Sequence, residues 1–198
     1  MLNIYLLRHG ETAWNADGNR YCGRTDLELT QKGKQQAKTV QAKLKDKHFN
    51  AIYASPLKRA THTAEIVSGN KEIITDERLI EVDFGEWEGK PRPQFTAENP
   101  TLWEDWISDP NSARAGGTGE SGKEVVARLN DFFNDLIKAS KGEEEDKNIM
   151  IVAHNGVNRL FLSHKLGMPL SNYRRFSLNN ASILNFTLDT DGEIAVKI

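Results

Sequence analysis

The sequence lacks the features that mark several large classes of protein. Its 198 residues include one cysteine, Cys22, which excludes an internal disulfide and predicts a reducing, cytoplasmic environment. No apolar run approaches the roughly 20 residues that a membrane-spanning helix needs, and the apolar start from Met1 to Leu7 is too short for a signal peptide. The net charge of −2 gives no overall basic field to attract nucleic acid or an anionic membrane. A binding site for an anion must therefore be local.

Internal repeats, low-complexity tracts and linkers are also missing, so we expect a single domain over residues 1–198. Segments typical of strands alternate with segments whose apolar residues recur at helical spacing. The predicted strands cover residues 3–7, 51–54, 71–75 and 148–153, the predicted helices cover residues 30–47, 55–68, 121–140 and 157–166, and a C-terminal hairpin joins 182–188 to 193–198. This alternation predicts an α/β fold with a mostly parallel central sheet.

Residues 81–120 interrupt the alternation. The segment reads as irregular and carries four of the six prolines and three of the four tryptophans. We expect an excursion that caps a site. Trp103 and Trp106 either stack on a ligand or anchor the excursion to the core, and whether Arg114 or His62 touches a substrate stays open as well.

The stretch Gly117 to Lys123 matches the GxxxxGK start of a nucleotide-binding loop. Glu124 stands where such a loop needs a serine or threonine for magnesium, and no apolar strand precedes the stretch. Ser121 and Glu124 instead fit a capping box at the start of the helix over 121–140. We therefore favour a helix cap over a nucleotide site, and leave a kinase-like protein as a distant alternative.

Charged and polar side chains follow two of the predicted strands directly. Arg8 and His9 come after the first strand, and His154 comes after the strand at 148–153, while Arg59 lies on the helix after the second strand. Ligands in open α/β sheets bind at the carboxyl ends of the strands. Two arginines and two histidines brought together there would repel each other unless they bind an anion, and guanidinium groups match phosphate oxygens in pairs.

Such a cluster suits phosphoryl transfer. His9 could be the nucleophile, provided that its other ring nitrogen donates to a carbonyl and fixes the tautomer. Donors on Arg8, Arg59 and His154 would meet the charge of the transition state, without the carboxylate cluster that would hold magnesium. A leaving alkoxide also needs a proton, and the acids between residues 79 and 89, which include Glu81 and Asp83, are not distinguished by spacing.

The residues that carry this chemistry resemble the motifs of the histidine phosphatase superfamily, the group that includes the cofactor-dependent phosphoglycerate mutases. The resemblance covers nearly the whole chain. It rests on five segments in order: Arg8-His9-Gly10-Glu11-Thr12 with Trp14-Asn15, Ser55 to Ala64, Glu81 to Gly89, Gly119-Glu120-Ser121, and Ala153-His154-Asn155-Gly156. It implies a phosphoglycerate mutase-like fold, which is a three-layer α/β/α sandwich. It also implies an enzyme that needs no metal and no cofactor.

The resemblance also implies roles for individual residues. His9 would be phosphorylated, Arg8, Arg59 and His154 would bind the phosphate, and Glu81 would serve as the acid and later as the base. Further candidates for binding are Asn15, the backbone around Cys22 and Gly23, and Asn155, which follows the second histidine where the family often has glycine. Cys22 itself is read as a packing residue rather than a nucleophile.

Within this superfamily the motifs favour hydrolysis of a small phosphorylated metabolite. The segment Glu81 to Gly89 resembles the phosphatase branch, and the chain looks short of the lid that a mutase needs to keep water from its phosphohistidine. Lys58 to Thr63 and the pair Gly23-Arg24 resemble the mutases, so a phosphoglycerate mutase is the main alternative. An inactive phosphate-binding protein is a third. The natural substrate and the oligomeric state, including a homodimer, stay open.

Overall fold

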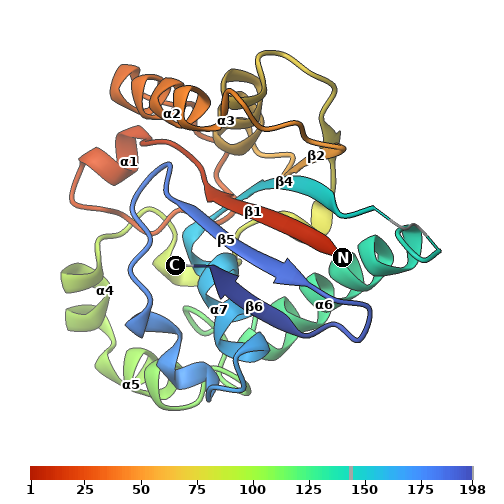
Figure 1. The fold of residues 1–198 in the computed structure, drawn as a ribbon. Helices are drawn as coiled ribbons and strands as arrows, with labels where there is room; N and C mark the ends of the chain where they lie inside the picture. Colours follow the sequence, from red (N-terminus) through yellow and green to blue (C-terminus); the bar gives the residue numbers. More distant parts are fainter. Residues whose placement is uncertain (143–144, 198) are drawn as a thin grey trace.

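A computed structural model describes residues 1–142 and 145–197, in which a six-stranded sheet has the order β3-β2-β4-β1-β5-β6 (Figure 1). The four strands β1 to β4 are parallel to one another, and the hairpin of β5 and β6 extends the sheet at the β1 edge, where β5 is antiparallel to β1. The strands are β1 (Leu2–Arg8), β2 (Ala51–Ala54), β3 (Ile74–Thr75), β4 (Lys147–Ala153), β5 (Ile183–Leu188) and β6 (Ile194–Lys197).

Helices connect these strands and cover both faces of the sheet. The α-helices are α1 (Ala13–Ala16), α2 (Gln31–Leu44), α3 (Lys58–Ser68), α4 (Arg92–Glu98), α5 (Pro100–Ser108), α6 (Gly122–Ala139) and α7 (Asn155–Lys165). Short 3-10 helices are η1 (Glu77–Leu79), η2 (Gly85–Trp87) and η3 (Leu170–Arg175). Among the described residues, no helix combines the length and apolar character that crossing a bilayer requires.

The alternation of side chains along the strands produces two separate cores. Ile4 and Leu6 of β1 pack with α6 and α7, whereas Leu7 packs with α2 and α3 on the other face. On β4, Ile151 packs in the core with α6 and α7, and Met150 packs in the core with α2 and α3. Figure 1 shows α2 and α3 on one side of the sheet and α6 and α7 on the other. The predicted three-layer α/β/α sandwich with a mostly parallel sheet is therefore confirmed.

Most predicted elements are found near their expected bounds, and three differ. The helix after β2 begins at Lys58 rather than at residue 55, because Leu57 keeps an extended backbone as the N-cap, and the hydroxyl of Ser55 contacts His154 instead. The predicted strand over 71–75 is reduced to Ile74 and Thr75. The last helix before the hairpin begins at residue 155 rather than 157, so that His154 itself is the N-cap. Residues 143 and 144, in the charged stretch before β4, and residue 198, at the end of the predicted hairpin, lie outside the described residues.

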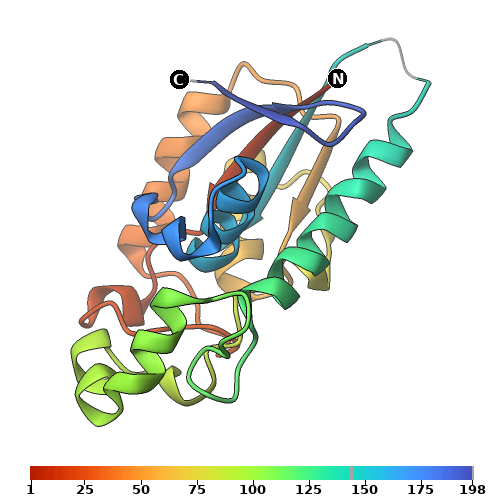
Figure 2. The same ribbon diagram turned by 90° about the horizontal axis from the view of Figure 1, so that it is seen from below.

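Residues 81–120 are more ordered than expected. Pro93 and Pro100 lie in the first turns of α4 and α5, where a missing N–H is tolerated, so the prolines start helices instead of preventing them. The capping box predicted for Ser121 and Glu124 at the start of α6 is confirmed, and the element directly before α6 is the helix α5 rather than a strand of the sheet. Figure 2 shows α4 and α5 beyond the end of the sheet that is opposite the two termini.

Candidate active site

His9 follows β1 at the carboxyl end of the parallel strands, and its ring is held in one tautomer. Nδ1 lies 2.7 Å from the carbonyl oxygen of Gly10, which can only accept, so Nδ1 carries the proton and Nε2 has a free lone pair. Burial, together with the charges of Arg59 and Arg8, holds the pKa of His9 well below its usual value of 6.5. His9 is therefore neutral at physiological pH, with a nucleophilic nitrogen at the cavity that it lines.

Gly10 allows this arrangement because the chain passes close to Gly33 at the start of α2. A Cβ atom at position 10 would lie 2.5 Å from the carbonyl oxygen of Gly33, and one at position 33 would lie 2.2 Å from the carbonyl oxygen of Glu11. Both glycines are therefore required by packing. The Gly10 amide also donates to Oγ1 of Thr63 in α3, which anchors the segment that carries His9.

His154 lies beside His9, with 5.2 Å between the ring centroids. Its Nδ1 accepts a bond of 3.1 Å from Nε of Arg59, a group that can only donate. The proton of the neutral ring is therefore on Nε2, which donates to the hydroxyl of Ser55 across 2.7 Å. Burial and the charge of Arg59 hold the pKa of His154 well below 6.5.

Arg59 is completely buried, and its guanidinium group is engaged by protein oxygens. Besides His154, it donates to the carbonyl groups of Cys22, Gly23 and Thr25 at 2.7 to 3.2 Å. Neither Arg59 nor His154 is among the residues that line the cavity. Arg59 therefore holds both the loop at 22–25 and His154, and contact of these two side chains with a phosphate stays a prediction.

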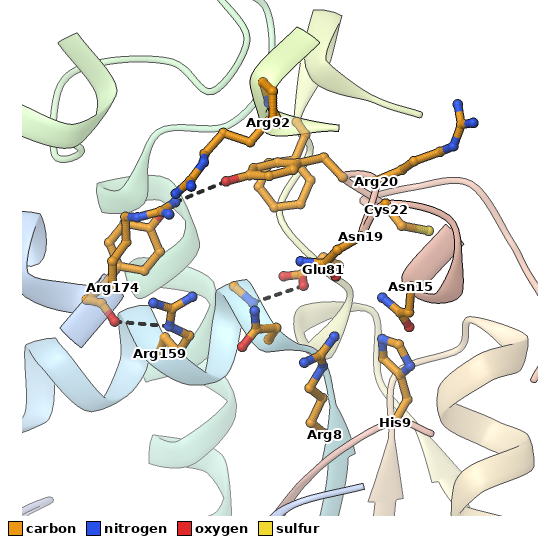
Figure 3. Close-up of a pocket in the computed structure, with 17 residues that line it drawn as sticks. Arg8, His9, Asn15, Asn19, Arg20, Cys22, Glu81, Arg92, Arg159 and Arg174 are labelled. Atoms are coloured by element: carbon orange, nitrogen blue, oxygen red, sulfur yellow. Dashed lines mark hydrogen bonds between the residues drawn. The ribbon is translucent and has the colours of Figure 1, made fainter. Parts of the chain in front are cut away.

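Glu81 is 4% exposed and is held at the start of α7. Its Oε1 accepts from the amides of Val82 and Val157 at 2.9 and 3.0 Å, and its Oε2 accepts from Gly156 at 2.9 Å. Three backbone amides thus hold the carboxyl group in one position. Oε2 accepts a single bond and keeps a lone pair for the cavity that Glu81 lines (Figure 3).

Asn15 is oriented by its own oxygen. Oδ1 lies 3.1 Å from the amide of Thr12 at the cap of α1, 3.1 Å from the hydroxyl of Thr12, and 3.1 Å from Nδ2 of Asn180. With Oδ1 occupied, the Nδ2 group of Asn15 is left to donate into the cavity, next to His9 (Figure 3). The amide can therefore bind an oxygen of a ligand.

The cavity between these residues has a volume of about 330 Å³ and is strongly basic. Five arginines line it and Glu81 is the one carboxylate among its lining residues; the arginines are Arg8, Arg20, Arg92, Arg159 and Arg174. Burial lowers the pKa of Arg8 to about 10, and its Nε is buried without a hydrogen-bond partner. An unpartnered guanidinium nitrogen at this place is suited to an anionic ligand.

The loop at 22–25 differs from the predicted substrate contact. Cys22 lines the cavity, and burial raises the pKa of its thiol to about 11, which makes it a poor nucleophile. Gly23 does not line the cavity. Its amide donates to the carboxylate of Glu88 at 2.9 Å, and a Cβ at position 23 would lie 2.3 Å from the carbonyl oxygen of Val82. The glycine is therefore explained by packing.

Asn155, at the start of α7, does line the cavity, and its Oδ1 is buried without a hydrogen-bond partner. The four residues whose contacts the sequence left open do not line it. Trp106 is fully buried and donates to the hydroxyl of Tyr173 at 2.9 Å, and Arg114 pairs with Glu124. Trp103 packs against the core with Arg174 over its ring, and His62 lies on α3. Both tryptophans thus anchor the excursion.

The sequence did not indicate Arg20, which follows α1, or three further arginines of the cavity, Arg92, Arg159 and Arg174. These three come from α4, α7 and η3, which lie far apart in the sequence. A signal existed for Arg159, which follows Asn155 by four residues and so shares its face of the helix. The arginines of α4 and η3 had no such signal, because nothing local indicates that these elements meet.

Within residues 1–142 and 145–197, no group of three or more His, Cys, Asp or Glu side chains is arranged to hold a metal ion. Independence from metal stays a prediction.

The chain belongs to the histidine phosphatase superfamily (branch 1), whose family model matches residues 4–198. It is 32% identical over 200 residues to phosphoserine phosphatase 1 of Hydrogenobacter thermophilus, an alignment that covers 100% of this chain and 92% of that protein. It is also 34% identical over 185 residues to a probable phosphoglycerate mutase GpmB of Erwinia tasmaniensis, covering 92% of this chain and 83% of the relative.

Solved structures give the same picture. The crystal structure of phosphoserine phosphatase from Entamoeba histolytica in complex with 3-phosphoglyceric acid superposes with a TM-score of 0.87 at 31% identity, over 100% of this chain and 96% of that one. The predicted family is therefore confirmed, and its relatives are enzymes of phosphate ester chemistry, both phosphatases and mutases.

Proposed function

We propose that the protein hydrolyses phosphomonoesters through a phosphohistidine on His9. The observation that carries the proposal is the bond from Nδ1 of His9 to the carbonyl of Gly10. It leaves the lone pair of Nε2 at a basic cavity, where a neutral imidazole can attack phosphorus.

In the first step Nε2 of His9 forms a bond to phosphorus while the ester P–O bond breaks. The leaving alkoxide takes a proton from Oε2 of Glu81, which ends the step as a carboxylate. The equatorial oxygens of the transferring group carry the negative charge. Arg8, with its unpartnered Nε, and the Nδ2 group of Asn15 are placed to stabilise that charge, and the loss of one such donor would slow the reaction by about 10²–10³-fold.

In the second step Glu81 acts as a base. Its carboxylate removes a proton from water, the oxygen of that water attacks the phosphohistidine, and the N–P bond breaks to release phosphate. His9 returns to its neutral form and Glu81 is protonated again, so the cycle is closed. The three amides that donate to Glu81 keep the carboxyl group in one place through both steps.

Arg59 and His154 contribute from behind the nucleophile. The charge of Arg59 lowers the pKa of both His9 and Arg8, and the ring of His154 lies beside that of His9, with 5.2 Å between the centroids. We assign them the positioning of the loop at 22–25 and of the His9 ring, and a share in stabilising the transferring phosphate.

The substrate is a small phosphorylated metabolite, as the cavity volume supports. Glu81, Phe84, Arg92 and Pro93 line the cavity from the segment at 81–120, which supports its role as a cap. The cavity also draws residues from β1 and from η3, near opposite ends of the chain, which supports one domain over residues 1–198.

A phosphoglycerate mutase is the second candidate, favoured by the 34% identity to a probable mutase. Both candidates use the same phosphohistidine and differ in whether water or a second phosphoglycerate takes the phosphoryl group. The experiment follows both outcomes at once. The protein is incubated with a panel of phosphorylated metabolites, including 3-phosphoglycerate primed with 2,3-bisphosphoglycerate, while free phosphate and isomer exchange are recorded.

We expect phosphate release without exchange, and no activity in His9→Ala. Exchange with little phosphate release would make the protein a mutase. Binding of phosphate compounds with neither reaction would make it an inactive phosphate-binding protein and overturn the proposal.

A further inference from the structure

The far side of the cavity carries more positive charge than one phosphate group requires. Figure 3 shows Arg159, Arg174 and Arg92 on the side away from His9 and Asn15, with Arg8 and Glu81 between the two groups. The phosphate to be transferred must lie at His9, within reach of Arg8. The other arginines are therefore too many for that phosphate and need another explanation.

These arginines are not neutralised by the protein. Arg20 also lines the cavity, but its Nε donates to the carboxylate of Asp17 at 2.8 Å. Among the described residues, Arg92, Arg159 and Arg174 form no ion pair. The five arginines that line the cavity outnumber its one carboxylate, Glu81, so their guanidinium groups repel each other, and an anion that binds between them removes that repulsion.

Neutral and aromatic groups hold two of them in place. Arg159 stacks over the ring of Tyr173 at 5.2 Å and donates from Nε to its carbonyl at 3.1 Å. Arg174 stacks over Trp103 at 4.6 Å and donates from Nη1 to the hydroxyl of Tyr21 at 3.0 Å. These contacts fix the guanidinium planes and use part of their donors, so the positive charge and the remaining N–H groups stay available to a ligand.

Arg92 completes the group from the cap. It is exposed, begins α4, and extends toward Arg174 in Figure 3. Arg92 and Arg174 both act electrostatically on the hydroxyl of Tyr21, which agrees with their closeness. The three arginines thus come from three elements that meet only in the folded chain.

We propose that Arg159, Arg174 and Arg92 form a subsite for a second anionic group, so that the substrate carries a carboxylate or a further phosphate besides the phosphoester cleaved at His9. This inference rests on the proposed function for the position of that phosphoester. Glycerol phosphates and other esters whose only anionic group is the phosphate would fill only the His9 end of the cavity.

The test compares substrates in pairs that differ in the second anion alone. 3-Phosphoglycerate is paired with glycerol 3-phosphate, which has a hydroxymethyl group in place of the carboxylate. Fructose 1,6-bisphosphate is paired with fructose 6-phosphate. The ratio of kcat/KM within each pair is measured for the wild type, Arg174→Gln, Arg92→Gln and Arg175→Gln. Arg175 is the control, because it is exposed, neighbours Arg174 in η3 and does not line the cavity.

We expect a wild-type preference of at least about 10-fold for the doubly anionic member of one pair, the effect of one charge-assisted hydrogen bond. The preferred pair identifies a carboxylate or a phosphate as the second anion. Arg174→Gln and Arg92→Gln should each narrow the ratio, and Arg175→Gln should leave it unchanged. Arg92→Gln guards against a folding defect, because among the described residues the side chain of Arg92 makes no hydrogen bond or ion pair, and the bond that its backbone carbonyl accepts from Thr96 does not depend on the side chain.

A wild-type ratio of kcat/KM near one in both pairs would overturn the proposed subsite. A ratio that is the same in Arg174→Gln, in Arg92→Gln and in the wild type would also overturn it, while the proposed hydrolysis would stand. If no ester is hydrolysed, the proposed function fails, and calorimetry of the same pairs with the wild-type protein still decides the inference. Tighter binding of the doubly anionic member, weakened by Arg174→Gln, would support it, and equal binding would refute it.

Discussion

The amide of Gly156 donates to Oε2 of Glu81 across 2.9 Å, although the two residues are 75 positions apart in the sequence. The bond joins the start of α7 to the segment that leads into the cap. It also explains why position 156 is glycine, because a Cβ there would lie 2.6 Å from Oε1 of Glu81 and 3.0 Å from Cγ2 of Val82.

Gly156→Ala should therefore displace the carboxyl group of Glu81. We expect kcat to fall by about 10²-fold, the lower range for loss of a general acid–base group, with a smaller change in KM. The matched control is Gly167→Ala, where φ is +66° and nothing lies within 4 Å of the added Cβ. That variant should lose roughly 1 kcal/mol of stability and keep its kcat. Equal kinetics for the two variants would contradict the role of Glu81.

The buried histidines make stability depend on pH. Because the pKa values of His9 and His154 are held well below 6.5 in the folded state, the unfolded chain binds more protons below pH 6.5. The free energy of unfolding should therefore decrease as the pH falls below 6.5, by up to roughly 1.4 kcal/mol per pH unit for each histidine.

Urea unfolding between pH 7 and 5 measures this slope. His9→Gln should reduce the slope of the unfolding free energy against pH by the contribution of one histidine. His48→Gln, at an exposed position, should leave that slope unchanged. Identical slopes for the wild type and His9→Gln would mean that His9 is not kept neutral by the fold.

Arg59 should matter for stability as well as for turnover. Arg59→Lys keeps a positive charge but cannot serve the carbonyl groups of Cys22, Gly23 and Thr25 together. We expect the free energy of unfolding to fall by about 3 kcal/mol, because a hydrogen bond to a charged group contributes about 1.5–3 kcal/mol. We also expect a lower kcat. Lys58→Gln, at the exposed neighbouring position, is the control. Weaker phosphate binding at unchanged stability would show instead that Arg59 is mainly a phosphate ligand.

Treatment with EDTA should not change the rate of phosphate release. The proposed steps use a histidine, arginines and a carboxyl group in the places where other phosphatases use metal ions. The activity is measured before and after dialysis against EDTA, and again after readdition of magnesium, manganese or zinc. A loss that one of these metals restores would require a metal in the mechanism.

The parts of the fold and site that the sequence predicted are those with a local cause. Continuous apolar runs marked the buried strands, and the polar residues after them marked the edge where ligands bind. His9 and His154 were found in this way, and their rings do lie together. The capping box of Ser121 and Glu124 was equally local, and it separated a helix start from a nucleotide-binding loop.

The parts that the sequence missed depend on contacts between distant segments. Gly23 matched a substrate-binding position of the family, but its amide is taken by Glu88, 65 residues away. The bonds from Arg59 to the carbonyl groups of the 22–25 loop were not indicated either, because the loop and α3 meet only in the folded chain, while its contact with the phosphate stays a prediction. Arg174 lies in a short 3-10 helix, and nothing in its neighbours indicates that it faces the same cavity as Arg8.

The central claim is that His9 carries the phosphoryl group, and rapid mixing of Glu81→Gln with p-nitrophenyl phosphate tests it most directly. The p-nitrophenolate leaving group needs no proton, so the first step should proceed, while hydrolysis of the phosphohistidine should be slow without the base. We predict a burst of about one p-nitrophenolate per protein and, by mass spectrometry, a phosphate group on His9. Absence of both the burst and the phosphate, phosphorylation of another residue, or turnover by His9→Ala at the wild-type rate would contradict the mechanism.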